Sequence, residues 1–444
     1  MSKKKSLIRT IIDNKFRYLA YMVVVLLFIF LRFYQLEERM QFSWDQVDNA
    51  WVSKNLIVNH VLPIYGMPVN QGSGFNIGPL YYYIIAGAYY LFNLDPVGAG
   101  IFAGLTSFIT FIVIFIIVMK VFNRSVAFFA AIIYLFSNYV ILFDRISWPV
   151  NFIPLISILL FYFLFKAITD NKKYLLLVAC VLGFSFHIHF TSVLYLVILL
   201  FSLPYFLNKN GLVYSTLSLL VFGVWVSPII VADTLVKAQA KNISGFFGNT
   251  FHGFHARRML QIAADAFIEF PGILGDGFLK FAYLFVPFFI IIYLHKNKEW
   301  FTLLKKNNKP FNIKKVKDIV TRKEFVLIYL MFLWFVIPWV ALSTYSGNIS
   351  NYYFSLTRPI AVTIIAYVLF YVFSLRNVVF KLLIFVFFAY FIYINLSLFL
   401  NYKTQGLAYF RRNAKEEVDR GIKNQFLYGA PESYLHYFYE RNIK

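Results

Sequence analysis

The chain has 444 residues, of which 60% are hydrophobic and 21% aromatic, and it contains 54 phenylalanines. This composition excludes an ordinary water-soluble domain. The net charge of +22 at pH 7 is explained by basic cytoplasmic loops and anionic lipid, so nucleic acid is not a predicted partner. The single cysteine, Cys180, lies within an apolar run, and disulfides therefore have no part in the fold.

Apolar runs long enough for a membrane-spanning helix recur along the sequence, and such a helix needs about 20 residues. The sequence therefore predicts an all-α polytopic membrane protein with about eleven transmembrane helices. One helix over 174–207 would be about 50 Å long, so this run must fold back at "HIHFTS" (187–192). The predicted spans are 18–36, 98–119, 126–143, 149–165, 174–188, 190–207, 212–231, 279–294, 325–342, 360–375 and 378–400.

The segment "PLYYYIIAGAYYLF" (79–92) has 14 residues, which is short for a span. If it lies flat, the loops on the N-terminal side hold 24 Lys and Arg, and the opposite loops, without the C-terminal tail, hold 8. If it spans the membrane, these numbers become 12 and 20. Because basic loops stay in the cytoplasm, we predict a flat helix. The chain is then a multi-pass plasma-membrane protein with a cytoplasmic N-terminus and an external C-terminus.

This orientation divides the chain into a transmembrane domain, 1–400, and a short external tail, 401–444. The domain carries a first external loop at 37–97, a second at 232–277 and a basic cytoplasmic loop at 295–324. In the first external loop, apolar side chains repeat with the period of a helix, which is typical of a helix that lies in the membrane interface. We therefore expect interfacial helices in this loop.

Two carboxylates lie in the stretch "QFSWDQVDNAW" (41–51), just past the first span. Asp45 and Asp48 are three residues apart and would point the same way from a helix. A carboxylate at the membrane edge is costly unless it is solvated, paired or used. Either one of the two is a general base or both contact a metal, or they simply cap the surface helix.

Further polar candidates lie beside predicted external ends of spans. Arg145, in "FDRISWPVN", either grips a phosphate with its planar fork or pairs with Asp144 at a helix end. Arg358 is the basic residue of the loop "STYSGNISNYYFSLTRP" and allows the same phosphate contact. His187 and His189 either contact substrate or are satisfied polar residues at the turn. The sequence contains no Gly-rich nucleotide loop, Walker sequence or zinc signature, so ATP-driven transport is not supported.

The order of several short motifs resembles one family of membrane enzymes. The chain is similar to glycosyltransferases of the GT-C class, in the branch related to protein O-mannosyltransferases and the lipid A aminoarabinose transferase. The resemblance covers roughly 17–205, and the segment 208–340 matches in topology alone. The motifs that carry it are "WDQVDNAW", "LPIYGMPVN", "GPLYYYIIAGAYYLFNLDP", "VFNRSVAFFAAIIYLFSNYVILFDRISWPVNFIPL", "GFSFHIHFTS" and "SNYYFSLTRP".

The resemblance implies a reaction on the external face. Such enzymes take a sugar from a polyprenyl-phosphate donor and pass it to an acceptor with inversion at the anomeric carbon. The family's catalytic carboxylate corresponds to Asp45, which is followed here by Gln46, whereas many members carry Glu at that place. Asp48 is then expected to help in binding acceptor or metal.

The same resemblance implies the other site residues. Arg145 corresponds to a donor-phosphate contact, and His189 matches a histidine that is common after the fifth span in this branch. Tyr353 and Arg358 lie in the family's last external motif. With Asp48, these four residues form the expected substrate-binding set.

The predicted function is a membrane glycosyltransferase that moves a hexosyl or pentosyl unit from a polyprenyl-phosphate donor to a cell-envelope glycan, lipid or protein. Membrane lipid, donor and acceptor are the expected partners. Metal dependence stays open, because the paired carboxylates are compatible with a divalent cation. The alternative is a lipid or oligosaccharide transporter, which should show internal repeats, interrupted helices or charges within its spans.

Overall fold

A computed structural model describes residues 18–19, 21–69, 75–235, 253, 255–297, 319–345 and 347–443. Within these ranges the chain consists of helices and has one isolated β-bridge, between Pro68 and Asn76. Parts of the predicted loops at 232–277 and 295–324, and all of the N-terminal segment before residue 18, lie outside the described residues.

Six helical segments of the described part are long and apolar enough to cross a membrane. A bent pair of helices adds a seventh, and four shorter apolar helices coincide with the remaining predicted spans. The all-α polytopic architecture is therefore confirmed, and the number of eleven crossings stays a prediction. The six segments are α5 (Val97–Val121), Pro149–Thr169 with η1 (Pro149–Phe152) and α8 (Ile153–Thr169), Lys209–Ala232 in α11 (Lys209–Leu235), α20 (Lys323–Ser343), Asn351–Phe373 with η5 (Asn351–Thr357) and α21 (Arg358–Phe373), and α22 (Val378–Asn401).

The bent pair shows that the predicted span at 126–143 is interrupted. The helix α6 (Arg124–Phe136) ends one residue before α7 (Asn138–Asp144) begins, and the two axes differ by 68°. Ser137 between them is extended, and its side chain accepts a hydrogen bond from the N–H of Val140. The shorter apolar helices are Tyr21–Phe33, α9 (Tyr174–Ser185), Phe190–Phe206 with η2 (Phe190–Ser192), α10 (Val193–Ser202) and η3 (Leu203–Phe206), and α17 (Phe285–Lys296).

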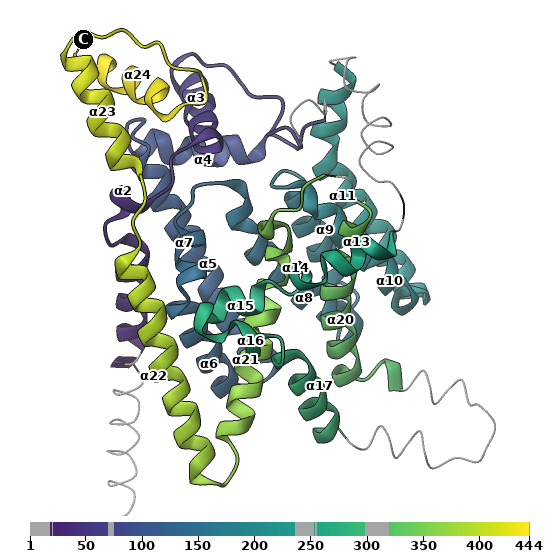
Figure 1. The fold of residues 1–444 in the computed structure, drawn as a ribbon. Helices are drawn as coiled ribbons and strands as arrows, with labels where there is room; N and C mark the ends of the chain where they lie inside the picture. Colours follow the sequence, from purple (N-terminus) through teal and green to yellow (C-terminus); the bar gives the residue numbers. More distant parts are fainter. Residues whose placement is uncertain are drawn as a thin grey trace, which may run out of the picture.

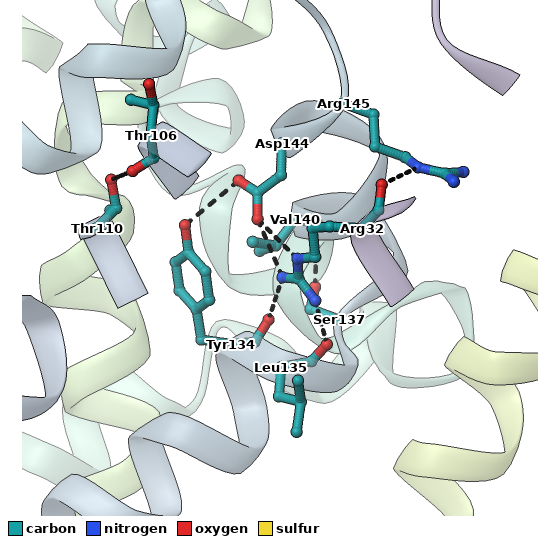
Figure 2. Close-up of polar contacts among 9 residues, drawn as sticks. All are labelled: Arg32, Thr106, Thr110, Tyr134, Leu135, Ser137, Val140, Asp144 and Arg145. Carbon is teal, nitrogen blue, oxygen red and sulfur yellow. Dashed lines mark hydrogen bonds and ion pairs between the residues drawn. The ribbon is translucent and has the colours of Figure 1, made fainter. Parts of the chain in front are cut away.

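A buried arginine supports this break (Figure 2). Arg32, near the end of the first helix, donates to the carbonyl oxygens of Leu135 at 2.6 Å and Tyr134 at 3.0 Å. Its Nε also donates to Asp144 Oδ2 at 3.1 Å, and both side chains are shielded from solvent. Asp144 therefore pairs with Arg32 and not with its neighbour Arg145. One cation thus satisfies two carbonyls freed by the break and ties three helices together.

Segments from the loop 37–97 and from the C-terminal tail gather at one end of the bundle (Figure 1). The predicted flat segment is α4 (Leu80–Leu91), which lies across this end, and the predicted surface helix is α3 (Trp44–Val58). The C-terminal tail forms two helices, α23 (Leu407–Asp419) and α24 (Pro431–Ile443), at the same end. Short helices in the region after residue 255 are α13 (Ala256–Gln261), α14 (Ala263–Ala266), α15 (Glu269–Leu274), η4 (Asp276–Phe278) and α16 (Leu279–Ala282).

Polar contacts hold the tail against the loop 37–97. Arg411 on α23 forms ion pairs with Glu37, at 3.0 Å, and with Asp95. Glu37 belongs to the short helix α2 (Leu36–Arg39). The hydroxyl of Tyr434 on α24 donates to the carbonyl oxygen of Leu94 at 2.8 Å. The tail is therefore part of the same surface as α3 and α4.

We predict that this end faces the outside of the cell. The connection 374–377 lies at the opposite end (Figure 1), and the 24-residue α22 between them is about 36 Å long. In a Cys180→Ala background, Gln425→Cys should react with an impermeant thiol reagent in sealed cells, and Arg376→Cys should react only after lysis. The reverse pattern would contradict the proposed orientation.

We also predict that Arg32→Met lowers the free energy of unfolding by about 3–5 kcal/mol, because it leaves Asp144 as an unpaired buried charge. Unfolding in mixed micelles of dodecylmaltoside and SDS measures this change. Arg39→Met is the matched control, since Arg39 is only partly buried and donates to two carbonyls near the surface. Equal stability of the two variants would show that the buried pair does not support the break.

Candidate active site

A cavity of about 1070 Å³ lies among the segments at the α3 end of the bundle. Four of the six predicted site residues line it: Asp45, Asp48, His189 and Tyr353. They come from α3, from the turn before α10 and from η5, so the fold brings together residues that are about 300 positions apart in the chain. Seven further aromatic side chains line its wall, among them Trp44, Tyr82, Tyr352 and Tyr428.

The capping of α3 leaves both carboxylates available. Ser43 is the residue before the helix, and its backbone N–H donates to Gln46 Oε1 at 3.1 Å, which completes a capping box. The alternative that Asp45 or Asp48 caps the helix is therefore wrong. Gln46 has a structural task at this position, and the side chain of Asp45 is exposed at the cavity wall.

The two carboxylates differ in their surroundings. Asp48 is half-buried, and its Oδ2 accepts a hydrogen bond from the Tyr82 hydroxyl at 2.6 Å. Loss of water raises its pKa, and the Tyr82 hydrogen bond partly offsets this effect. The walls of the cavity also remove enough water around the accessible Asp45 to raise its pKa, and the charge of Asp48 raises it further. Asp45 is thus the more accessible of the two carboxylates, and its raised pKa suits proton abstraction.

His189 lies on another part of the cavity wall as a neutral donor. Its Nδ1 accepts from the backbone N–H of Thr191 at 3.2 Å, which assigns the proton of the neutral ring to Nε2. Burial lowers the pKa of His189 to about 4, so the ring is uncharged at neutral pH. Its ring contacts those of Tyr352 and Tyr353, with centroids 5.7 and 6.0 Å away. These neighbours hold the imidazole in place.

Arg358 does not lie on the cavity wall. Its guanidinium forms a two-point ion pair with Glu269, at 2.7 and 3.0 Å, and both side chains are fully buried. It also lies 3.8 Å from the centre of the Phe143 ring. This differs from the expectation that Arg358 reaches a donor phosphate, because its charge is already neutralised inside the protein.

Arg145 is likewise directed into the protein (Figure 2). It is buried, its Nε donates to the carbonyl oxygen of Arg32 at 3.0 Å, and its Nη2 donates to the carbonyl oxygen of Tyr34. Arg145 does follow α7 directly, but its guanidinium binds two backbone carbonyl oxygens at the end of the first helix. The sequence motif gave no sign of these partners, which are more than 100 residues away.

Metal ligation has limited support in the described part of the chain. There, no group of three or more His, Cys, Asp or Glu side chains is placed to hold a metal ion. Asp45 and Asp48 alone offer two carboxylates.

Comparisons with known proteins agree with this geometry. Residues 76–231 match the sequence profile of the dolichyl-phosphate-mannose-protein mannosyltransferases. ArnT from Cupriavidus metallidurans is similar in structure in its apo state, with a TM-score of 0.60, 12% identity, and coverage of 96% of this chain and 85% of that one. The same protein bound to undecaprenyl phosphate gives a TM-score of 0.56 at 11% identity, with coverage of 96% and 76%. The chain has the GT-C fold.

A second GT-C structure extends the similarity. The apo oligosaccharyltransferase from Archaeoglobus fulgidus gives a TM-score of 0.52 at 13% identity, and the alignment covers 90% of this chain and 59% of that one. No curated protein matches the chain by sequence. The resemblance inferred from the motifs is confirmed. The profile match includes His189 and Arg145 but not α3, so within the GT-C fold the case for Asp45 and Asp48 depends on the cavity itself.

Sequence reasoning missed Tyr82 and Tyr428. Tyr82 is one of three consecutive tyrosines, and the helical period alone did not indicate which of them faces Asp48. Tyr428 lies in the tail, and its place on the cavity wall depends on how the tail folds back.

We predict that Asp48→Asn lowers the pKa of Asp45, because the charge of Asp48 favours the protonated form of its neighbour. Conversely, Tyr82→Phe should raise the pKa of Asp48, because it removes a hydrogen bond to the ionised form. Infrared difference titration of the carboxyl band, with Asp45→Asn as the reference for assignment, measures both shifts. An unchanged Asp45 pKa in Asp48→Asn would show that the two carboxylates do not interact.

Proposed function

We propose that this chain is a membrane glycosyltransferase that moves a hexosyl or pentosyl unit from a polyprenyl-phosphate donor to a cell-envelope acceptor on the external face. The observation that carries this proposal is the cavity at the α3 end, where Asp45 and Asp48 share a wall within a GT-C fold. The undecaprenyl phosphate bound to the similar ArnT supports a polyprenyl-phosphate donor. The match of 76–231 to a mannosyltransferase profile supports the reaction class.

Asp45 is the proposed general base. A polyprenyl phosphate stays in the bilayer, so its sugar is presented at the membrane surface. Asp45 takes the proton of the acceptor hydroxyl while the acceptor oxygen bonds to the anomeric carbon and the bond from that carbon to the phosphate oxygen breaks. Attack opposite the leaving phosphate inverts the anomeric centre. The raised pKa of Asp45 makes it a better proton acceptor than an ordinary aspartate.

Neutral donors are the proposed contacts to the leaving phosphate. Neither Lys nor Arg is among the described residues that line the cavity. The Nε2–H of His189 and the hydroxyl of Tyr353 can donate hydrogen bonds to phosphate oxygens where negative charge builds up. In this assignment Arg145 and Arg358 act on the fold, and His189 and Tyr353 act on the donor.

The transporter alternative is less well supported. The bundle does contain the interrupted helix α6–α7 and internal charges, as a transporter predicts. However, Arg32 is paired with Asp144, Arg358 is paired with Glu269, and Arg145 donates to backbone carbonyl oxygens. Such pairs hold helices together and do not offer a free charge to a passing ion or substrate.

We predict that Asp45→Asn lowers turnover by about 10²–10⁴-fold, because it removes the proton acceptor but preserves the shape of the side chain. Mass spectrometry of lipid-linked sugars in cells that carry only the variant provides a first measurement that does not require the sugar to be known. The Asp45→Asn cells should accumulate the same lipid-linked sugar as cells without the gene.

Two variants control this experiment. Asp48→Asn should have a smaller effect, and Asp419→Asn, at an exposed position on α23, should leave the lipid profile unchanged. If Asp45→Asn restores the normal profile, or if Asp48→Asn is the more damaging change, Asp45 is not the base. If cells without the gene accumulate no lipid-linked sugar, the proposed function itself is wrong.

A further inference from the structure

The C-terminal tail supplies part of the cavity wall. Leu427, Tyr428 and Gly429, in the connection between α23 and α24, line the same cavity as Asp45 and Asp48. More than half of the Tyr428 surface is exposed, at 55%. A segment that only covered the outside of the first loop would not direct a large aromatic ring into the cavity. The tail therefore contributes to what the cavity can bind.

Stacking and hydrogen bonds fix the position of Tyr428. Its ring stacks on that of Trp51, with centroids 5.6 Å apart and planes 21° apart. Its carbonyl oxygen accepts from Trp51 Nε1 at 3.2 Å and from Ser433 Oγ at 2.8 Å. Trp51 also contacts the rings of Tyr434 and Tyr437 of α24, with centroids 5.3 and 5.5 Å away, so the support of the Tyr428 ring is itself well packed.

Trp44 provides a second ring beside this segment. Trp44 is 64% exposed although it lines the cavity. A Cβ at Gly429 would lie 2.1 Å from Trp44 Cε3, so only a glycine allows the tail to approach the indole this closely. Trp44, Asp48 and Trp51 follow one another at intervals of four and three residues, and therefore share one side of α3. This side presents an aromatic ring, a carboxylate and the support for Tyr428.

This combination matches the chemistry of a sugar ring. A pyranose or furanose ring has an apolar C–H face, which contacts an aromatic ring, and a rim of hydroxyls, which need hydrogen-bond partners. The Asp48 carboxylate accepts hydrogen bonds from such hydroxyls. The pKa of Tyr428 is raised to about 12 by burial and by the charge of Asp48, so its hydroxyl remains a donor at neutral pH. The C–H face of a sugar ring can therefore contact the aromatic rings, and its hydroxyls can bond to Asp48 and Tyr428.

We propose that Trp44 and Tyr428 form a subsite for a sugar ring of the acceptor, and that the acceptor is a saccharide. This inference rests on the proposed function. The donor sugar is tied to a lipid and arrives from the bilayer, whereas the subsite is built from α3 and the connection before α24, at the extreme end of the bundle (Figure 1). A ring that reaches this end of the cavity comes from the aqueous side. Asp45 lines the same cavity as this subsite, so a hydroxyl of the bound ring can be presented to the proposed base.

Saturation-transfer NMR on the full chain in detergent tests the subsite without any donor. The probes are methyl glycosides of common hexoses and pentoses, and a short peptide with Ser and Thr serves as the comparison ligand. We expect transfer from protein to the ring C–H protons of at least one glycoside. Tyr428→Ala should reduce the signal at least fivefold, and Tyr428→Phe should retain most of it, because the ring is preserved.

Two further variants make the result interpretable. Trp44→Ala should also reduce the signal, and Trp44→Phe, which keeps an aromatic ring against Gly429, should retain part of it, so the loss can be separated from a folding defect of the tail. Tyr409→Ala, an exposed tyrosine of α23 that does not line the cavity, should behave as wild type.

The inference is overturned if no glycoside contacts the wild-type protein, or if both Tyr428→Ala and Trp44→Ala bind as wild type does. It is also overturned if the peptide alone shows a contact that Tyr428→Ala removes, since the acceptor would then be a protein. Because no donor takes part, these outcomes are independent of the accumulation of lipid-linked sugar that tests the proposed function.

Discussion

The fold depends on how Arg32 satisfies the carbonyls that the α6–α7 break exposes. Inside a bilayer no water is present to donate hydrogen bonds to these carbonyls, so a broken helix persists only where the protein supplies a donor. Arg32 donates to Leu135 and Tyr134 and places its charge against Asp144. The break in turn directs the chain from α7 into η1, and the residues Trp148 to Val150 at that junction lie on the cavity wall. The buried ion pair therefore supports the segment that forms one part of the cavity wall.

The sequence could predict features that depend on neighbouring residues. Helix length, the flat α4 and the joint orientation of Asp45 and Asp48 all follow from local period and charge. The partners of Arg145 and Arg358 could not be predicted in this way, because they lie 111 and 89 residues away. An arginine beside the membrane looks the same in sequence whether it binds a phosphate or a buried glutamate. The place of Tyr428 on the cavity wall could not be predicted for the same reason, because the tail is far from α3 in the sequence and contacts it only in the folded chain.

The capping of α3 by Ser43 and Gln46 leaves the neighbouring Asp45 carboxylate without a structural partner among the described residues. A helix that begins at the membrane surface needs acceptors for its first N–H groups. Ser43 and Gln46 satisfy this need, and neither residue is ionised. The carboxylate of Asp45 is therefore free of a structural task, although it lies in the first turn, where the helix dipole favours an anion. An acidic residue in place of Gln46 would add a third negative charge beside Asp45 and Asp48.

The two kinds of charged group in this protein have different surroundings, and the difference identifies their tasks. Arg32, Asp144, Glu269 and Arg358 are fully buried and paired, so removing one partner affects the fold. Asp45 and Asp48 repel each other on the wall of a cavity, and this arrangement costs stability without closing a contact between helices. A protein retains such a costly pair where the charge is used on a ligand. This contrast is why we propose the accessible carboxylates, and not the buried arginines, as the groups that act on a ligand.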